Sequence, residues 1–178
     1  MPSRCTSRRL VTPRIASVMV SLLAGSACAS PVQQPTTSDP DIAFLNSGRL
    51  PASVPFSEAV RIGPVVQLSG QLGAKPGELT VVPGGLDAES RQMLDNIRHT
   101  LVAHGLTMDD VVKCTIMLAD MSEWAAFNAI YATYFSPPYP ARSAMGVNGL
   151  ALGARVEAEC MAVDGAARAK GGGSVKAP

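Results

Sequence analysis

A chain of 178 residues has the length of one ordinary domain and can bury a single hydrophobic core. Apolar residues make up 47% of the chain and aromatic residues only 4%, which predicts a mostly aliphatic core. The formal net charge is +1, and the first thirty residues hold four arginines and no acid, so the remainder is slightly acidic. This balance argues against nucleic-acid binding, and we expect no nucleic-acid partner.

Residues 1–29 indicate an export signal rather than part of the fold. A basic stretch precedes the apolar run at residues 15–24 (IASVMVSLLA), which is too short to span a bilayer stably. The letters SRRL at residues 7–10 resemble part of a twin-arginine signal. Two processing routes remain open, cleavage after Ala29 or lipidation of Cys28. We therefore expect a periplasmic or otherwise exported protein, which touches the membrane only through a lipid anchor if Cys28 is lipidated.

Composition also sets the boundaries of the folded domain. Residues 30–41 are rich in proline and polar residues, which predicts a flexible linker. Residues 166–178 have low complexity and predict a disordered tail. The domain is therefore expected at residues 42–165, and it contains no internal repeat.

Five strands are expected, each a short β-prone run bounded by turn residues: 57–62, 65–69, 111–119, 143–147 and 155–163. Gly63 and Pro64 supply the turn between the first two strands.

Two helices are expected between these strands. The first runs over residues 87–104, with Asp87 as its N-cap and Gly105 as its terminator, and carries apolar residues at helical spacing. Asp120 and Glu123 resemble a capping box that opens the second, which ends near Phe135. The order ββαβαββ predicts an α+β domain with two helices on one face of a sheet.

The sheet face away from the helices is expected to be half apolar. In the strands at 111–119 and 155–163, one alternating set suits packing under helices, while the other includes Met117, Glu157 and Met161. This second set is too apolar for a face left in water. We therefore expect another copy of the chain to cover it, in an oligomer.

The cysteines and histidines give no pattern typical of a metal site. Cys114 and Cys160 lie in strand candidates without a CxxC motif, and His99 and His104 lie on one helix. We therefore expect no metal. If the protein is exported, a Cys114–Cys160 disulfide is one alternative. Two buried thiols in neighbouring strands are the favoured interpretation, since a free cysteine behaves as a small core residue.

Arg142 is a candidate for binding a carboxylate. It follows the Pro-rich turn at residues 137–141 and has no charged neighbour in sequence, and its guanidinium can donate two parallel hydrogen bonds to a carboxylate. Glu157 lies in the next strand. If those two strands are neighbours, both residues share a pocket in which Glu157 handles a water or a proton. Alternatively, they pair with each other or lie on a wet surface.

Several motifs along the chain resemble the YjgF/RidA family of enamine/imine deaminases. The similarity covers about residues 54–163, and the motifs appear in the family's order: Arg91-Gln92 with Asn96-Ile97, VVK at 111–113, Asn128 with Tyr131, PARS at 140–143 and VEAE at 156–159.

The resemblance implies a chorismate-mutase-like α+β fold with a mixed sheet, and a homotrimer whose sheets line a central barrel, with active sites between subunits. It also implies hydrolysis of small 2-imino or 2-enamino acids, such as 2-iminopropanoate or 2-iminobutanoate, to 2-oxo acids and ammonia. No metal or organic cofactor is implied. A non-catalytic module that binds small carboxylates, and a hydrolase of another aminocarboxylate, remain alternatives.

The resemblance also assigns roles to residues. Arg142 corresponds to the arginine that binds the substrate carboxylate, and Glu157 to the glutamate that positions or activates water. Ser69, Gly70 and Asn128 match residues that lie at the substrate pocket. Ser69 could instead be an ordinary strand-end hydroxyl, and Asn128 an amide that bonds nearby backbone.

Some positions depart from the family pattern. Phe56 stands where many members have tyrosine, and Ala144 stands where cysteine is frequent. Gly73 and Ala151 replace usual prolines. These changes leave Arg142 and Glu157 in place and bear on the substrate range.

Overall fold

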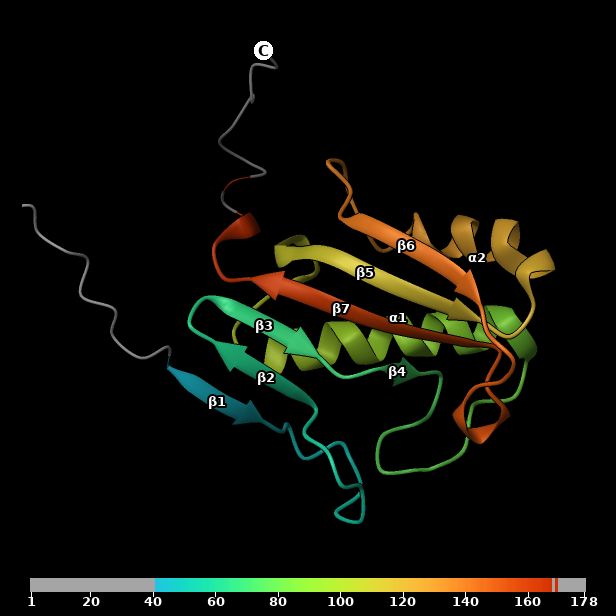
Figure 1. The fold of residues 1–178 in the computed structure, drawn as a ribbon, viewed down its shortest axis with the longest axis horizontal. Coiled ribbons are helices and arrows are strands. Elements are labelled where there is room, and N and C mark those ends of the chain that lie inside the picture. The colour runs from blue at the N-terminus through green and yellow to red at the C-terminus, as the bar shows by residue number, and fades with distance from the viewer. Residues whose placement is uncertain (1–40, 168, 170–178) are drawn as a thin grey trace, which may run out of the picture. The chain divides into compact units, whose positions relative to one another are not determined.

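The computed structural model describes residues 41–167 and residue 169, which form one mixed β-sheet with two helices (Figure 1). The predicted export signal, the linker up to residue 40 and most of the predicted tail lie outside these residues. The strands are β1 (Ile42–Leu45), β2 (Ala59–Ile62), β3 (Val65–Leu68), β4 (Gln71–Leu72), β5 (Val111–Leu118), β6 (Ala141–Gly146) and β7 (Val156–Val163). The helices are α1 (Gly85–Ala103) and α2 (Trp124–Tyr131).

The sheet has the strand order β1-β2-β3-β7-β5-β6, and β4 pairs with β7 on the same side as β3, at Glu157 and Ala158. All strand pairs are antiparallel except β5 and β6, which are parallel and are joined through α2. The five predicted strands are present within two residues at each end. β1 and β4 were not predicted: β4 has only two residues, and β1 has no adjacent Gly-Pro turn of the kind that marks β2 and β3 as a hairpin.

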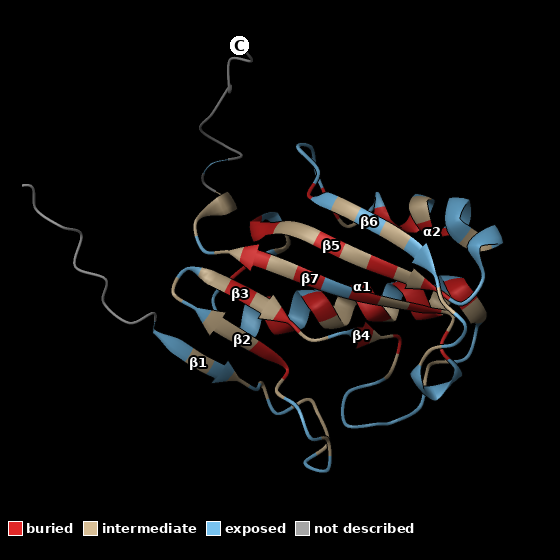
Figure 2. Ribbon diagram, viewed as in Figure 1, coloured by how far each residue is buried: buried red, intermediate tan, exposed pale blue. Residues whose placement is uncertain are grey.

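Both helices lie on the same face of the sheet and enclose the core (Figures 1 and 2). The apolar stripe predicted for α1 is confirmed, since four of its residues are fully buried: Met93, Leu94, Ile97 and Leu101. They pack against alternate residues of the sheet, among them Ile116 and Val156. Burying each such side chain is worth about 1.5–3 kcal/mol, so this layer fixes which sheet face is covered.

The ends of α1 were predicted with mixed success. Gly105 has φ of +79° and follows the last turn, so its predicted role as terminator is confirmed. Asp87 is not the N-cap, because α1 begins at Gly85 after Gly84. Asp87 lies in the first turn and forms an ion pair with Arg91 at 3.0 Å.

The capping box predicted for the second helix is only half present. Asp120 accepts a hydrogen bond from the Ser122 N–H (2.8 Å) and caps a 3-10 turn at Met121–Glu123 that leads into α2. The Glu123 carboxylate binds Arg155 instead of the backbone (3.0 Å). α2 ends at Tyr131, earlier than predicted, and a turn continues toward Phe135.

The predicted thiol pair is wrong, because Cys114 and Cys160 form a disulfide. The two residues lie directly opposite each other in the register of β5 and β7, with Cα atoms 4.2 Å apart. This spacing is typical of cross-strand neighbours whose side chains approach closely. The sequence shows that both residues lie in strands but does not give their register.

The face away from the helices exposes large apolar side chains, as predicted. Phe44 is 73% exposed and Ile42 is 53% exposed on β1, and Met145 on β6 is 45% exposed. Met145 pairs with Met117, and Phe44 pairs with Val60, so this apolar surface extends across several strands. The oligomer that would cover it stays a prediction.

Candidate active site

Arg142 lies on β6, the edge strand of the sheet, on the face that the helices cover. Its parallel register partner is Cys114, which is buried under the helices, so both side chains are on the same face. The guanidinium carbon lies 4.8 Å from the centre of the Tyr131 ring on α2, within cation–π distance. Among the described residues, no acidic side chain pairs with Arg142. The guanidinium is therefore available to an external carboxylate.

A cleft of about 350 Å³ surrounds this guanidinium, and its lining residues include Asn128, Tyr131, Tyr139 and Arg142. The Asn128 Oδ1 atom and the Tyr131 hydroxyl are both buried, and neither has a hydrogen-bond partner within the described part of the chain. A buried polar group left unpaired costs about 1–3 kcal/mol. Both atoms are therefore open to a hydrogen-bond partner from outside the described chain.

The Tyr131 ring on which Arg142 stacks is uncharged and is held in place by neighbouring aromatic rings. Its ring packs against Phe127 and Phe135, with centroid distances of 5.8 and 4.4 Å. Burial raises the pKa of Tyr131 to about 12, although the positive charge of Arg142 acts in the opposite direction. The hydroxyl is therefore protonated at neutral pH and can donate a hydrogen bond.

Glu157 lies on β7, on the face away from the helices, and contacts Gly70. A Cβ at residue 70 would overlap the Glu157 Oε1 atom, so glycine is what allows this carboxylate to lie against the backbone. Burial raises the pKa of Glu157 above that of an ordinary glutamate, and the charge of Glu159 raises it further. A carboxyl group of this kind is suited to exchanging a proton with water or substrate.

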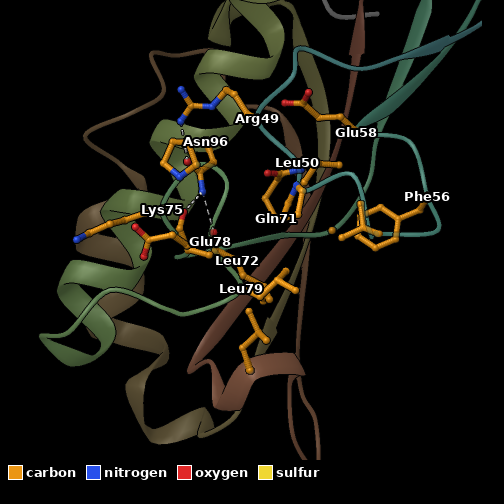
Figure 3. Close-up of a pocket in the computed structure, with 16 residues that line it drawn as sticks. Arg49, Leu50, Phe56, Glu58, Gln71, Leu72, Lys75, Glu78, Leu79 and Asn96 are labelled. Atoms are coloured by element: carbon orange, nitrogen blue, oxygen red, sulfur yellow. Dashed lines mark hydrogen bonds between the residues drawn. The ribbon is translucent and has the colours of Figure 1, made fainter.

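A pocket of about 110 Å³ opens beside Gly70 and includes Phe56 in its wall (Figure 3). Two residues of the predicted substrate site thus line one pocket. The Ser69 hydroxyl donates to the Ser57 carbonyl (2.7 Å), which is the strand-end contact left open as an alternative. Ala144 lies on the same strand face as Arg142 and packs against the core.

Within one chain, Arg142 and Glu157 do not share a pocket. The predicted pairing of their strands is wrong, because β5 lies between β6 and β7. After β5 the chain forms α2 and then β6, which lies at the edge of the sheet. β7 follows and lies on the other side of β5. Glu157 lies opposite Met117, which is three residues after Cys114, the register partner of Arg142. The backbones at Arg142 and Glu157 are therefore separated by two strand spacings across the sheet and three residues along it, which is roughly 14 Å. Their two side chains lie on opposite faces of the sheet.

The sequence motifs did not identify all the residues that line the cleft and the pocket. Tyr131 appeared only as a family motif, although its position one helical turn after Asn128 places both residues on one side of α2. Tyr139 and the pocket-wall residues Leu79 and Leu152 were not predicted. Their positions depend on loop conformations that carry no periodic signal.

The chain matches the profile of the family described as Endoribonuclease L-PSP over residues 47–164. It therefore belongs to this family, which is the YjgF/RidA family, and the resemblance seen in the motifs is confirmed at that level.

Curated relatives and solved structures agree with this assignment. The goat 2-iminobutanoate/2-iminopropanoate deaminase is 41% identical over 123 residues, covering 68% of this chain and 90% of the goat protein. The human protein of the same name is 36% identical, covering 68% and 89%. The crystal structure of yeast Mmf1 matches with a TM-score of 0.65 and 31% identity, covering 70% and 99%. The predicted α+β fold, with its mixed sheet and two helices on one face, is confirmed.

Proposed function

We propose that this protein hydrolyses small 2-imino acids, or their 2-enamino tautomers, to 2-oxo acids and ammonia. The observation that carries the proposal is the Arg142 guanidinium, which lacks an acidic partner among the described residues and stacks on Tyr131 beside buried, unpaired polar atoms. Relatives with up to 41% identity are named 2-iminobutanoate/2-iminopropanoate deaminase, which supports the same reaction here.

The proposed reaction consumes one water and needs no metal or organic cofactor. Arg142 binds the substrate carboxylate in two charge-assisted hydrogen bonds and so orients the C=N carbon. Glu157 holds a water against that carbon and accepts its proton as the new C–O bond forms. That proton passes to the nitrogen and gives a carbinolamine. The carbinolamine hydroxyl then loses its proton, which is relayed to the nitrogen as the C–N bond breaks, so ammonia leaves as the C=O bond of the 2-oxo acid forms. Proton transfer of this kind contributes about 10²–10⁴ in rate.

We further propose that each site combines Arg142 of one protomer with Glu157 and Gly70 of its neighbour in a homotrimer. Two observations support this arrangement. The first is that these groups lie on opposite faces of one sheet, and the second is that the Arg142 cleft contains unpaired buried atoms. The apolar face that includes Phe44 and Met145 would then line the central barrel.

Ammonia release from freshly generated 2-iminobutanoate tests the activity. We expect the wild type and Val102→Ala, an exposed position on α1, to accelerate the release, whereas Arg142→Ala does not. Equal rates for Arg142→Ala and the wild type would contradict the proposal. Binding of a 2-oxo acid without any turnover would favour a non-catalytic module, and turnover of a different aminocarboxylate in a substrate panel would favour the other alternative.

We also propose that the chain is exported. The Cys114–Cys160 disulfide supports export, because disulfides persist mainly in oxidising compartments. In the described residues, no helix is long and apolar enough to cross a membrane. Mass spectrometry of the mature protein from cell fractions tests the proposal and distinguishes cleavage after Ala29 from lipidation at Cys28. An intact N-terminus in the cytosolic fraction would contradict it.

A further inference from the structure

The loop that joins β6 to β7 contains Asn148 followed by Gly149. It connects the strand of Arg142 to the strand of Glu157 at one end of the sheet (Figure 1). Asn148 and Gly149 are both exposed and lie outside the helices and strands. Neither residue takes part in the proposed reaction, so the loop is open to chemistry of its own.

An asparagine that precedes a glycine is prone to an intramolecular reaction. The backbone nitrogen of the following residue can reach the side-chain carbonyl carbon of the asparagine and close a five-membered ring. Glycine favours this step because it has no Cβ to shield its nitrogen and because its backbone adopts many conformations. The fold then decides whether that nitrogen is free to react.

The Gly149 nitrogen is neither hydrogen-bonded nor crowded. Within the part of the chain that the structure describes, no hydrogen bond involves the Gly149 N–H or the Asn148 side chain. A Cβ built on Gly149 would have no heavy atom within 4 Å apart from its chain neighbours, so this side of the loop is open to solvent. Neither secondary structure nor packing therefore opposes closure of the ring.

The other three asparagines of the sequence are protected by the fold. Asn46 precedes Ser47, whose N–H donates to the Glu58 carboxylate at 2.7 Å, and the Asn46 Oδ1 atom accepts from the Glu58 N–H at 3.0 Å. Asn96 and Asn128 lie within α1 and α2, where the N–H of the next residue bonds to a carbonyl four residues earlier. In all three cases the attacking nitrogen is already held.

We propose that Asn148 is a modification site, at which the folded protein deamidates spontaneously to aspartate and isoaspartate. The Gly149 nitrogen bonds to the side-chain carbonyl carbon of Asn148, and its proton leaves with the amide nitrogen as ammonia, which gives a succinimide. Water then opens this ring. Addition of water at the side-chain carbonyl gives aspartate, and addition at the backbone carbonyl gives isoaspartate, in which the chain runs through one extra carbon. The net reaction consumes one water and releases one ammonia.

Hydrogen bonds on both sides of the loop limit the effect of the change. Before it, the Val147 N–H donates to the Leu118 carbonyl at 3.0 Å. After it, the Arg155 N–H donates to the Glu89 carboxylate at 2.8 Å, and the Arg155 carbonyl accepts from the Ala119 N–H at 3.0 Å. The new carboxylate lies in water and the extra carbon is taken up within residues 148–154, so the modified protein should keep its fold and accumulate.

Mass spectrometry of the aged protein tests the proposal, which does not depend on the proposed deaminase function. The purified, disulfide-bonded protein is held for days at neutral pH and then digested with trypsin, which cuts after Arg142 and Arg155. The peptide 143–155 contains no amide side chain other than that of Asn148. Deamidation therefore appears as a mass gain of one dalton, and isoaspartate as a substrate for protein isoaspartyl methyltransferase.

We expect Asn148 to change at least an order of magnitude faster than Asn96, which is followed in the peptide 92–98 of the same digest. The rate at Asn148 should rise with pH, because the attacking nitrogen must lose its proton.

Three variants test the mechanism and its effect on the fold. Gly149→Ala places a Cβ beside the attacking nitrogen and should slow the reaction by an order of magnitude or more. Asn148→Gln keeps an amide but requires a larger ring, so the modification should disappear. Asn148→Asp carries the charge of the product and should melt at nearly the wild-type temperature, because the position is exposed.

A synthetic peptide of residues 143–155 is the unfolded reference. If the folded protein stays unmodified over the interval in which this peptide deamidates, the fold protects Asn148 and the proposal is overturned. Equal rates at Asn148 and Asn96 would also overturn it, because the change would then follow unfolding rather than local exposure. A clear loss of stability in Asn148→Asp would contradict the inference that the loop absorbs the change.

Discussion

The Arg142 cleft and the pocket beside Gly70 are built in different ways. The cleft lies at the sheet edge under α2, and its buried Asn128 and Tyr131 oxygen atoms have no partners in the described chain. At the pocket, the Asn96 and Glu58 side chains are held by hydrogen bonds within the same chain. The comparison indicates that the cleft keeps polar atoms open to a partner from outside the described chain, whereas the polar groups of the pocket are already bonded within it.

The strongest test of this difference uses two inactive variants. Arg142→Ala and Glu157→Gln should each lower kcat/KM by about 10²–10⁴. When they are co-expressed in equal amounts, half of the protomers contribute an intact Arg142 and half an intact Glu157. About a quarter of the shared sites are then whole, and about that fraction of activity should return.

Recovery depends on co-assembly, so the separately purified variants, mixed without refolding, are the control. If the co-expressed oligomers stay as inactive as the single variants, the site is not shared between protomers.

A smaller effect should follow from Gly70→Ala. The new Cβ overlaps the end of the flexible Glu157 side chain, so the carboxylate must move while the backbone need not. We expect kcat/KM to fall about 10–100-fold with little change in melting temperature, since a misplaced catalytic group is costly even when the fold is intact.

Gly73→Ala provides the contrasting variant. Its Cβ would lie 2.6 Å from the backbone of Glu89 in α1, which cannot move aside easily. We expect it to lower the free energy of unfolding by about 1–3 kcal/mol. Equal losses of stability in both glycine variants would contradict the proposed role of Gly70.

Two substitutions of Tyr131 separate the contribution of its ring from that of its hydroxyl. Tyr131→Phe keeps the ring against Arg142 and removes only the unpaired hydroxyl, so KM should rise several-fold. Tyr131→Leu also removes the cation–π contact, and a further loss of about two- to fivefold should follow. Substrate affinity measured for both variants, with circular dichroism to confirm folding, checks this order. Identical kinetics for Tyr131→Phe and the wild type would show that the hydroxyl has no role in binding.

The smallest expected effect concerns pH. Burial, and then the charge of Glu159, raise the pKa of Glu157, and the proposed step needs the ionised carboxylate. Activity should therefore fall as the pH drops through this raised pKa. Glu159→Gln removes the second cause, so the acidic limb of the kcat/KM profile should move to lower pH while burial keeps it above that of an ordinary glutamate. A limb that moves to higher pH would contradict the assignment of this limb to Glu157.

Periodic features of the fold could be predicted from the sequence because they depend on neighbours along the chain. The buried stripe of α1, the alternation in β5 and β7, and the end of α1 at Gly105 all follow from local spacing. The two-residue strand β4 and the left-handed Leu152 could not be predicted, since nothing periodic marks them.

The sequence by itself determined the family, the α+β class and the chemical type of the candidate residues, Arg142 for a carboxylate and Glu157 for a proton. Only the tertiary structure decided that β5 separates their strands, that Cys114 faces Cys160, and that the Glu157 carboxylate lies against the backbone of Gly70. The physical reason is that side-chain type and local spacing are properties of the chain, whereas strand order and register are set by which packing of the whole sheet buries its apolar faces.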